Sequence, residues 1–130
     1  MLFQLFIIGA ILSLLIVAFV HSFFGEKILL RPMFKYRGNK VLESKLARMV
    51  LRFAWHLTSL LWVFIAGMIY TAGFSPEHLP SVILLTFGAG FVGIGIFDLI
   101  ASRGKHIGWP ILTAIGACCL GAYAVMGTSS

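Results

Sequence analysis

The sequence predicts an all-α fold, an integral membrane bundle of four transmembrane helices in a single domain over residues 1–130. Hydrophobic residues make up 60% of the chain and charged residues 11%, with a mean hydropathy of +1.03, which is more apolar surface than one core of this size can bury. Four apolar stretches also approach the roughly 20 helical residues that cross ~30 Å of hydrocarbon. The expected helices cover about residues 2–24, 40–72, 81–101 and 109–126.

The first expected helix ends in the stretch "HSFFGE", where Gly25 is predicted to close it as a left-handed cap. The segment that follows alternates bulky apolar residues with bases and contains Pro32. It is predicted to lie in the membrane interface, with side chains such as Leu30 in the lipid boundary. A secretory signal is the alternative reading of the first stretch, but its front lacks Lys and Arg and no small-residue cleavage pattern follows.

The second expected helix begins at Lys40, because Asn39 is a good cap and nothing breaks the pattern before Gly73. At 1.5 Å per residue this helix is about 50 Å long. Its first turns are therefore expected to extend beyond the bilayer into the cytoplasm.

The third and fourth expected helices carry small residues at matching intervals, in "FGAGFVGIG" and "AIGACCLGA". Small residues four apart let helix backbones approach closely in lipid. We therefore expect these helices to pack tightly, with Ala89 and Gly93 facing Ala117 and Gly121.

Two other patterns in this half indicate no ligand site. Gly88, Gly90 and Gly93 spell a dinucleotide-binding fingerprint, but that motif needs a preceding strand and a water-exposed helix start. The adjacent Cys118 and Cys119 have neither metal-ligand spacing nor an obvious disulfide partner.

The basic residues predict the orientation, because Lys and Arg in short joints stay in the cytoplasm. Both chain ends are therefore expected outside, and the net charge of +6 is expected to face the anionic lipids of the inner leaflet. Nucleic acid is not expected as a partner, since no base-stacking module is present. The ten basic residues lie in two joints: Lys27, Arg31, Lys35, Arg37, Lys40, Lys45, Arg48 and Arg52 in the first, Arg103 and Lys105 in the second.

Ionisable side chains near the membrane are the candidates for chemistry, since each costs at least ~2.5 kcal/mol at the centre of a span. The predicted orientation brings one or two of them from each helix to the cytoplasmic boundary. Imidazole and carboxylate groups are the ligands of zinc, iron and copper. We therefore expect a transition-metal site with His21, His56 and His106 as ligands and Asp98 or Glu26 as carboxylate ligand or outer partner. A haem between two of the histidines is the alternative.

Each candidate also has a purely structural interpretation. The histidines at helix ends are suited to the hydrated interface, and Trp109 to an interfacial aromatic belt. Arg52 is suited to anchoring on lipid headgroups. Asp98 would be neutralised by Arg52 or by Arg103.

Three blocks, "HSFFGEKILLRPMF", "LRFAWHLTSLLW" and "RGKHIGWPIL", resemble a family of small bacterial four-helix membrane proteins with the patterns H-S-x-x-G-E, R-x-x-W-H and R-G-x-H-x-x-W-P. The resemblance implies a multi-pass protein of the bacterial inner membrane and brings no activity or cofactor with it. With Asp98, the residues of these blocks form the candidate binding set: His21, Glu26, Arg52, His56, His106 and Trp109.

The leading functional hypothesis is a metal-binding polar cluster at the cytoplasmic mouth, with Arg52 positioning an anionic group. The second is a non-catalytic accessory subunit that docks a larger membrane partner or a copy of itself. Haem binding and a small transporter come third. The transporter is disfavoured because few polar side chains continue a path through the outer half of the bundle. An enzyme acting on lipid stays open, but no nucleophile and base pair at a recognisable spacing.

Overall fold

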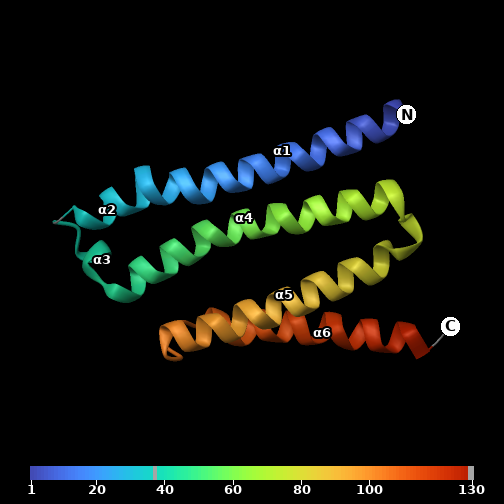
Figure 1. Ribbon diagram of the computed structural model, residues 1–130. Coiled ribbons are helices and arrows are strands. Elements are labelled where there is room, and N and C mark those ends of the chain that lie inside the picture. The colour runs from blue at the N-terminus through green and yellow to red at the C-terminus, as the bar shows by residue number, and fades with distance from the viewer. Residues whose placement is uncertain (37, 129–130) are drawn as a thin grey trace. The chain divides into compact units, whose positions relative to one another are not determined.

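The computed structural model describes residues 1–36 and 38–128, with side chains to residue 126. These residues form helices and turns without a strand, which confirms the all-α prediction (Figure 1). The elements in chain order are α1 (Leu2–Phe24), η1 (Gly25–Leu30), α2 (Arg31–Lys35), α3 (Lys40–Glu43), α4 (Lys45–Phe74), η2 (Pro76–His78), α5 (Leu79–Ser102) and α6 (Gly108–Thr128).

Four helical segments are long and apolar enough to cross a membrane: Leu2–Lys35, Lys45–Phe74, Pro76–Ser102 and Gly108–Met126. Among the described side chains the buried hydrophobic ones are Ala18, Leu30, Ala66 and Ile94. The core of the described residues is therefore small, and many large apolar side chains are left exposed.

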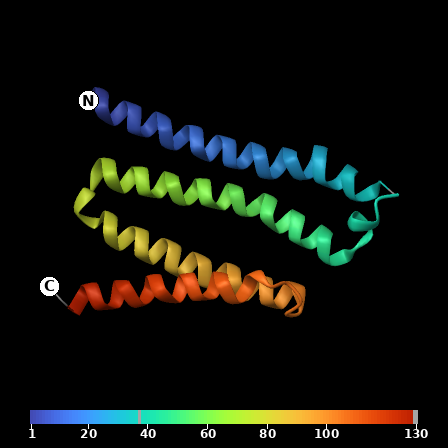
Figure 2. The same ribbon diagram turned by 180° about the vertical axis from the view of Figure 1, so that it is seen from behind.

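The chain divides into two compact units, Met1–Gly73 and Phe74–Ser130. In the first, α1 runs beside α4 (Figures 1 and 2). In the second, α5 packs along α6. The single domain expected from the sequence stays a prediction.

The prediction that Gly25 ends the first helix is wrong. Gly25 has right-handed helical angles, φ −61° and ψ −43°, and the chain continues through the π-helical η1 into α2. Pro32 explains the wider turn, because its ring has no N–H to donate and crowds the carbonyl one turn before it. Leu30, expected in the lipid boundary, is only 2% exposed.

The second helix begins later than predicted. Asn39 does act as a cap, accepting hydrogen bonds from the backbone N–H groups of Val41 and Leu42. The helix it starts, α3, lasts one turn, because Ser44 adopts an extended backbone with ψ 125°. The Ser44 hydroxyl then accepts from the Ala47 N–H at 3.4 Å and starts α4. A second cap therefore interrupts the expected continuous helix.

The predicted tight packing of the last two helices is confirmed, but through other glycines. A Cβ on Gly116 would lie 2.6 Å from both the Gly88 carbonyl oxygen and the Val92 nitrogen, and Gly95 lies against Thr113. In contrast, a Cβ on Gly93 or Gly121 would meet nothing within 4 Å. Choosing which small residues face each other requires the rotation of each helix about its axis, and the spacing alone leaves that open.

Candidate functional site

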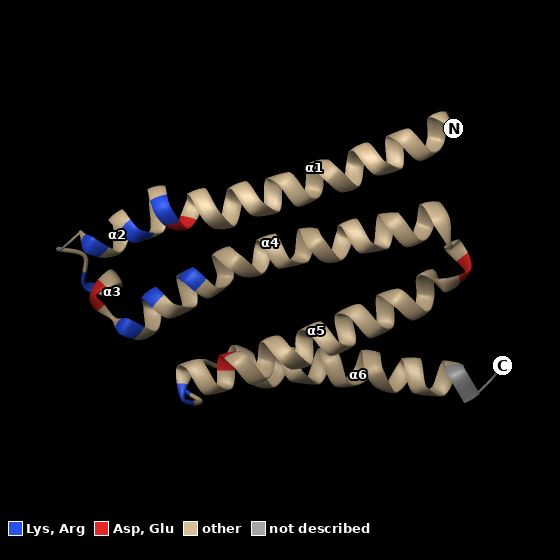
Figure 3. Cartoon of the chain, viewed as in Figure 1, with Lys and Arg blue, Asp and Glu red and all other residues tan. Residues whose placement is uncertain are grey.

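Glu26 lies at the centre of a charged cluster in the first unit, whose basic residues gather at one end (Figure 3). Arg52 holds its carboxylate with two donors, Nε to Oε2 at 3.1 Å and Nη2 to Oε1 at 3.0 Å. Arg31 adds Nε to Oε1 at 3.2 Å. The side chain of Glu26 is only 17% exposed, so the paired guanidinium of Arg52 is suited to fixing both position and orientation of the carboxylate.

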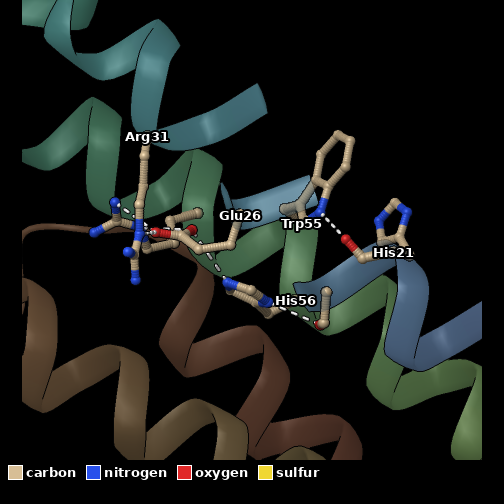
Figure 4. Close-up of polar contacts among 7 residues, drawn as sticks. His21, Glu26, Arg31, Trp55 and His56 are labelled. Carbon is tan, nitrogen blue, oxygen red and sulfur yellow. Dashed lines mark hydrogen bonds and ion pairs between the residues drawn. The ribbon is translucent and has the colours of Figure 1, made fainter. Parts of the chain in front are cut away.

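His56 connects this cluster to a serine on α1. Its Nδ1 lies 2.9 Å from the Ser22 Oγ, and its Nε2 lies 3.5 Å from the Glu26 Oε2 (Figure 4). Ser22 and Glu26 are one helical turn apart, so both face the same helix, α4. Sequence reasoning missed Ser22, although its spacing of four from Glu26 inside "HSFFGE" was the available signal.

His21 has a different environment. Its ring stacks on Trp55 at a centroid distance of 4.2 Å and meets the edge of Trp62 at 5.0 Å. The Trp55 Nε1 donates to the His21 carbonyl oxygen at 2.9 Å. Figure 4 shows the rings of His21 and His56 pointing in different directions. His21 therefore contributes to the packing of α1 on α4 and does not join His56 around a common point.

Arg52 also joins α4 to α2, since its guanidinium lies over the Phe34 ring at 5.2 Å. This cation–π contact and the two bonds to Glu26 leave Arg52 well anchored. The sequence analysis expected Arg52 to position an anionic group, and here that group is the protein's own carboxylate.

A groove of about 510 Å³ opens beside the cluster in the first unit. Phe19 and Phe23, whose rings stack at 5.4 Å, form its apolar wall. Its polar lining consists of Ser22, Glu26, His56, Lys27 and Arg31. The lining of the groove thus combines an apolar wall, cations, and a hydroxyl bonded to an imidazole.

The second unit holds a separate pair. Asp98 is 1% exposed, and its Oδ2 lies 2.6 Å from the Nδ1 of His106, in the turn before α6. Within this unit Asp98 pairs with His106 and not with Arg103 as expected, whereas its pairing with Arg52 of the first unit stays a prediction. The reversal at Arg103 and Gly104, with φ 52° and 73°, returns the chain to Asp98 and brings His106 to it. The other carboxylate oxygen of Asp98, Oδ1, is buried without a hydrogen-bond partner among the described residues.

Trp109, another predicted binding residue, lies in the first turn of α6. Its carbonyl oxygen accepts from the Thr113 hydroxyl at 2.8 Å. Among the described residues of the second unit, its indole forms no hydrogen bond with Asp98 or His106. Its position is therefore explained by the start of the helix.

The seven predicted site residues thus fall into local groups: Glu26, Arg52 and His56 in one cluster, His21 beside it, Asp98 with His106 in the second unit, and Trp109 in the first turn of α6. Within residues 1–36 and 38–128, no three His, Cys, Asp or Glu side chains are grouped so that they could hold a metal ion. A metal at Glu26 would have to displace arginine donors from both carboxylate oxygens. The three-histidine metal site stays a hypothesis.

The fold and the groove define a class: an all-helical protein with four helices able to cross a membrane and a polar groove beside the first. Comparisons with models of protein families, with curated proteins and with solved structures found no match for the chain. The resemblance of the three sequence blocks to a bacterial membrane family stays a prediction. The function is therefore argued from the geometry of the groove.

Proposed function

We propose that this chain is a multi-pass membrane protein that binds an anionic phospholipid in the groove of its first unit. One observation carries the proposal: the groove joins an apolar wall, Phe19 and Phe23, to a cationic end, Lys27 and Arg31. An acyl chain fits the first part and a phosphate the second. Ligand sites typically combine such an apolar lining with a few placed polar groups.

The charges support an anionic ligand. The cations in and beside the groove, Lys27, Arg31 and Arg52, outnumber the single carboxylate of Glu26, which leaves two positive charges in excess. Arg52 directs two donors to Glu26 and Arg31 uses only Nε, whereas the Lys27 ammonium forms no hydrogen bond or ion pair with the described residues. The terminal nitrogens of Arg31 and the Lys27 ammonium are therefore the donors available to a phosphate.

The location of the groove on the chain supports a lipid over a soluble anion. It lies on the first apolar segment, Leu2–Lys35, toward the end where the basic residues begin. By the preference of basic joints for the cytoplasm, that end belongs at the inner leaflet, with both chain ends outside. In a bacterium this would be the inner membrane, whose anionic lipids supply the ligand.

Native mass spectrometry of the protein released from bilayers of mixed zwitterionic and anionic phospholipid tests the proposal. The double variant Lys27→Ala/Arg31→Ala should lose about thirtyfold in affinity for the anionic lipid, which is roughly 1 kcal/mol for each charge. The matched control is Arg103→Ala/Lys105→Ala, which removes the same charge from the joint of the second unit. An equal loss in both doubles would show diffuse surface charge and overturn the proposal.

A further inference from the structure

The lining of the groove contains a chain of a hydroxyl, an imidazole and a carboxylate, from Ser22, His56 and Glu26. The carboxylate can only accept, so the imidazole proton belongs on Nε2, facing Glu26. The Nδ1 lone pair then accepts the Ser22 hydroxyl proton across 2.9 Å. This is the relation of nucleophile, base and orienting carboxylate that activates a serine.

We propose that Ser22 is the nucleophile of an esterase site, with His56 as general base and Glu26 as the positioning residue. The substrate class is the acyl ester of an anionic glycerophospholipid. This inference rests on the proposed function, because the same groove must first bind that lipid.

The order of residues along the helix supports this substrate. Phe19 and Phe23 line the groove on either side of Ser22 in sequence, and Lys27 and Arg31 follow one and two turns later. Ser22 and Lys27 are five residues apart, which is at most roughly 7.5 Å along the axis at the α-helical rise of about 1.5 Å per residue. In a glycerophospholipid the ester carbonyl lies a few bonds from the phosphate, between it and the acyl chain. A lipid with its phosphate on Lys27 and Arg31 therefore brings its ester to Ser22.

The reaction balances with water as the second reactant. The Ser22 Oγ bonds to the ester carbonyl carbon while its proton passes to His56 Nδ1, and the electron pair of the carbonyl double bond moves onto the oxygen, which becomes an oxyanion beside the cationic lining of the groove. The bond to the glycerol oxygen then breaks, and that oxygen leaves with the proton from His56. Water attacks the acyl-serine, its proton passes through His56 back to Ser22, and the products are a fatty acid and a lysophospholipid.

Glu26 acts through His56 and not on the ester. Its 3.5 Å distance from Nε2 is longer than a good hydrogen bond, and such contacts commonly shorten when the imidazole becomes charged during the reaction. Arg52 and Arg31 fix the carboxylate for that step. Changing Glu26→Gln should shift the pH profile of hydrolysis and lower kcat more than it raises KM, which loss of packing alone would not do.

The experiment reconstitutes the full chain in nanodiscs of phosphatidylglycerol and measures free fatty acid and lysolipid by mass spectrometry. Ser22→Ala and His56→Gln should each lower the release rate about a hundredfold or more. Ser13→Ala is the matched control, since Ser13 is on the same helix but its hydroxyl bonds to the Gly9 carbonyl oxygen. A fluorophosphonate probe should modify Ser22 in the unaltered protein, and this readout does not depend on a folded variant.

The ether-linked phosphatidylglycerol analogue separates the two proposals, because it binds in the groove but has no ester to cleave. Binding of the ether lipid with neither fatty acid release nor a probe adduct at Ser22 would overturn the esterase and leave lipid binding standing. Absence of ether-lipid binding would overturn the proposed function itself. Release that persists unchanged in Ser22→Ala would assign the activity to another residue and overturn the inference.

Discussion

The Trp55 indole lies directly against the backbone of Gly25: a Cβ built on residue 25 would be 2.5 Å from its Nε1. The indole is held from two sides, by its bond to the His21 carbonyl oxygen and by its stacking on the His21 ring. This contact joins α1 to α4 beside the groove. It explains a glycine that the local sequence suggested as a helix cap.

Gly25→Ala should therefore destabilise the first unit by about 1–3 kcal/mol, the usual cost of overpacking. Thermal unfolding followed by circular dichroism in one detergent measures it. Gly67→Ala is the control, because a Cβ there meets nothing within 4 Å and alanine favours a helix by up to about 1 kcal/mol over glycine. Equal effects at the two positions would contradict the close approach of Trp55.

Gly116→Ala should separate α5 from α6, because the added Cβ would meet backbone atoms of Gly88 and Val92 that cannot rotate away. We expect a loss of about 3 kcal/mol, at the upper end for overpacking. Gly121→Ala, with open space around it, should leave unfolding unchanged or slightly improved. Both variants are compared by the same thermal unfolding measurement, and a tolerant Gly116 would show that the helices are further apart.

Glu26→Gln should weaken the contact between η1 and α4, since Arg52 and Arg31 would lose a charged acceptor. Hydrogen bonds to charged groups contribute about 1.5–3 kcal/mol when well shielded, and partial exposure of Arg31 and Arg52 places the expected loss near the lower value. Denaturation at low and high salt measures it. Glu77→Gln, in an exposed pair with His78, should change stability by less than about 0.5 kcal/mol. Indistinguishable results for the two variants would mean that Glu26 stabilises nothing.

Asp98→Ala should destabilise the second unit by about 3 kcal/mol, because it removes a buried acceptor and leaves His106 without its partner. Asp98→Asn, which keeps one acceptor oxygen of the same shape, should recover part of this loss. Thermal unfolding of the two variants measures the difference. Full stability of the alanine variant would show that the contact with His106 is not formed.

The sequence by itself determined the features that depend on neighbouring residues. Apolar stretches of membrane-spanning length predicted four helices, and the Asn39 side chain predicted a cap because it accepts from the N–H groups of Val41 and Leu42. The blocks around His21, Glu26, Arg52 and His56 predicted a polar site. Glu26, Arg52 and His56 do meet in one cluster, and His21 lies beside it.

Only the tertiary structure decided the partners. Gly25 permits the close approach of the Trp55 indole, 30 positions later, and Ser22 meets the His56 imidazole, 34 positions later. Asp98 meets His106 because the chain reverses between them. Such contacts depend on the rotation and axial offset of one helix against another. A helix with apolar residues on every side can turn any of several faces toward its neighbour, so the apolar pattern is compatible with several rotations of the helix about its axis. The packing of particular atoms selects one of these rotations.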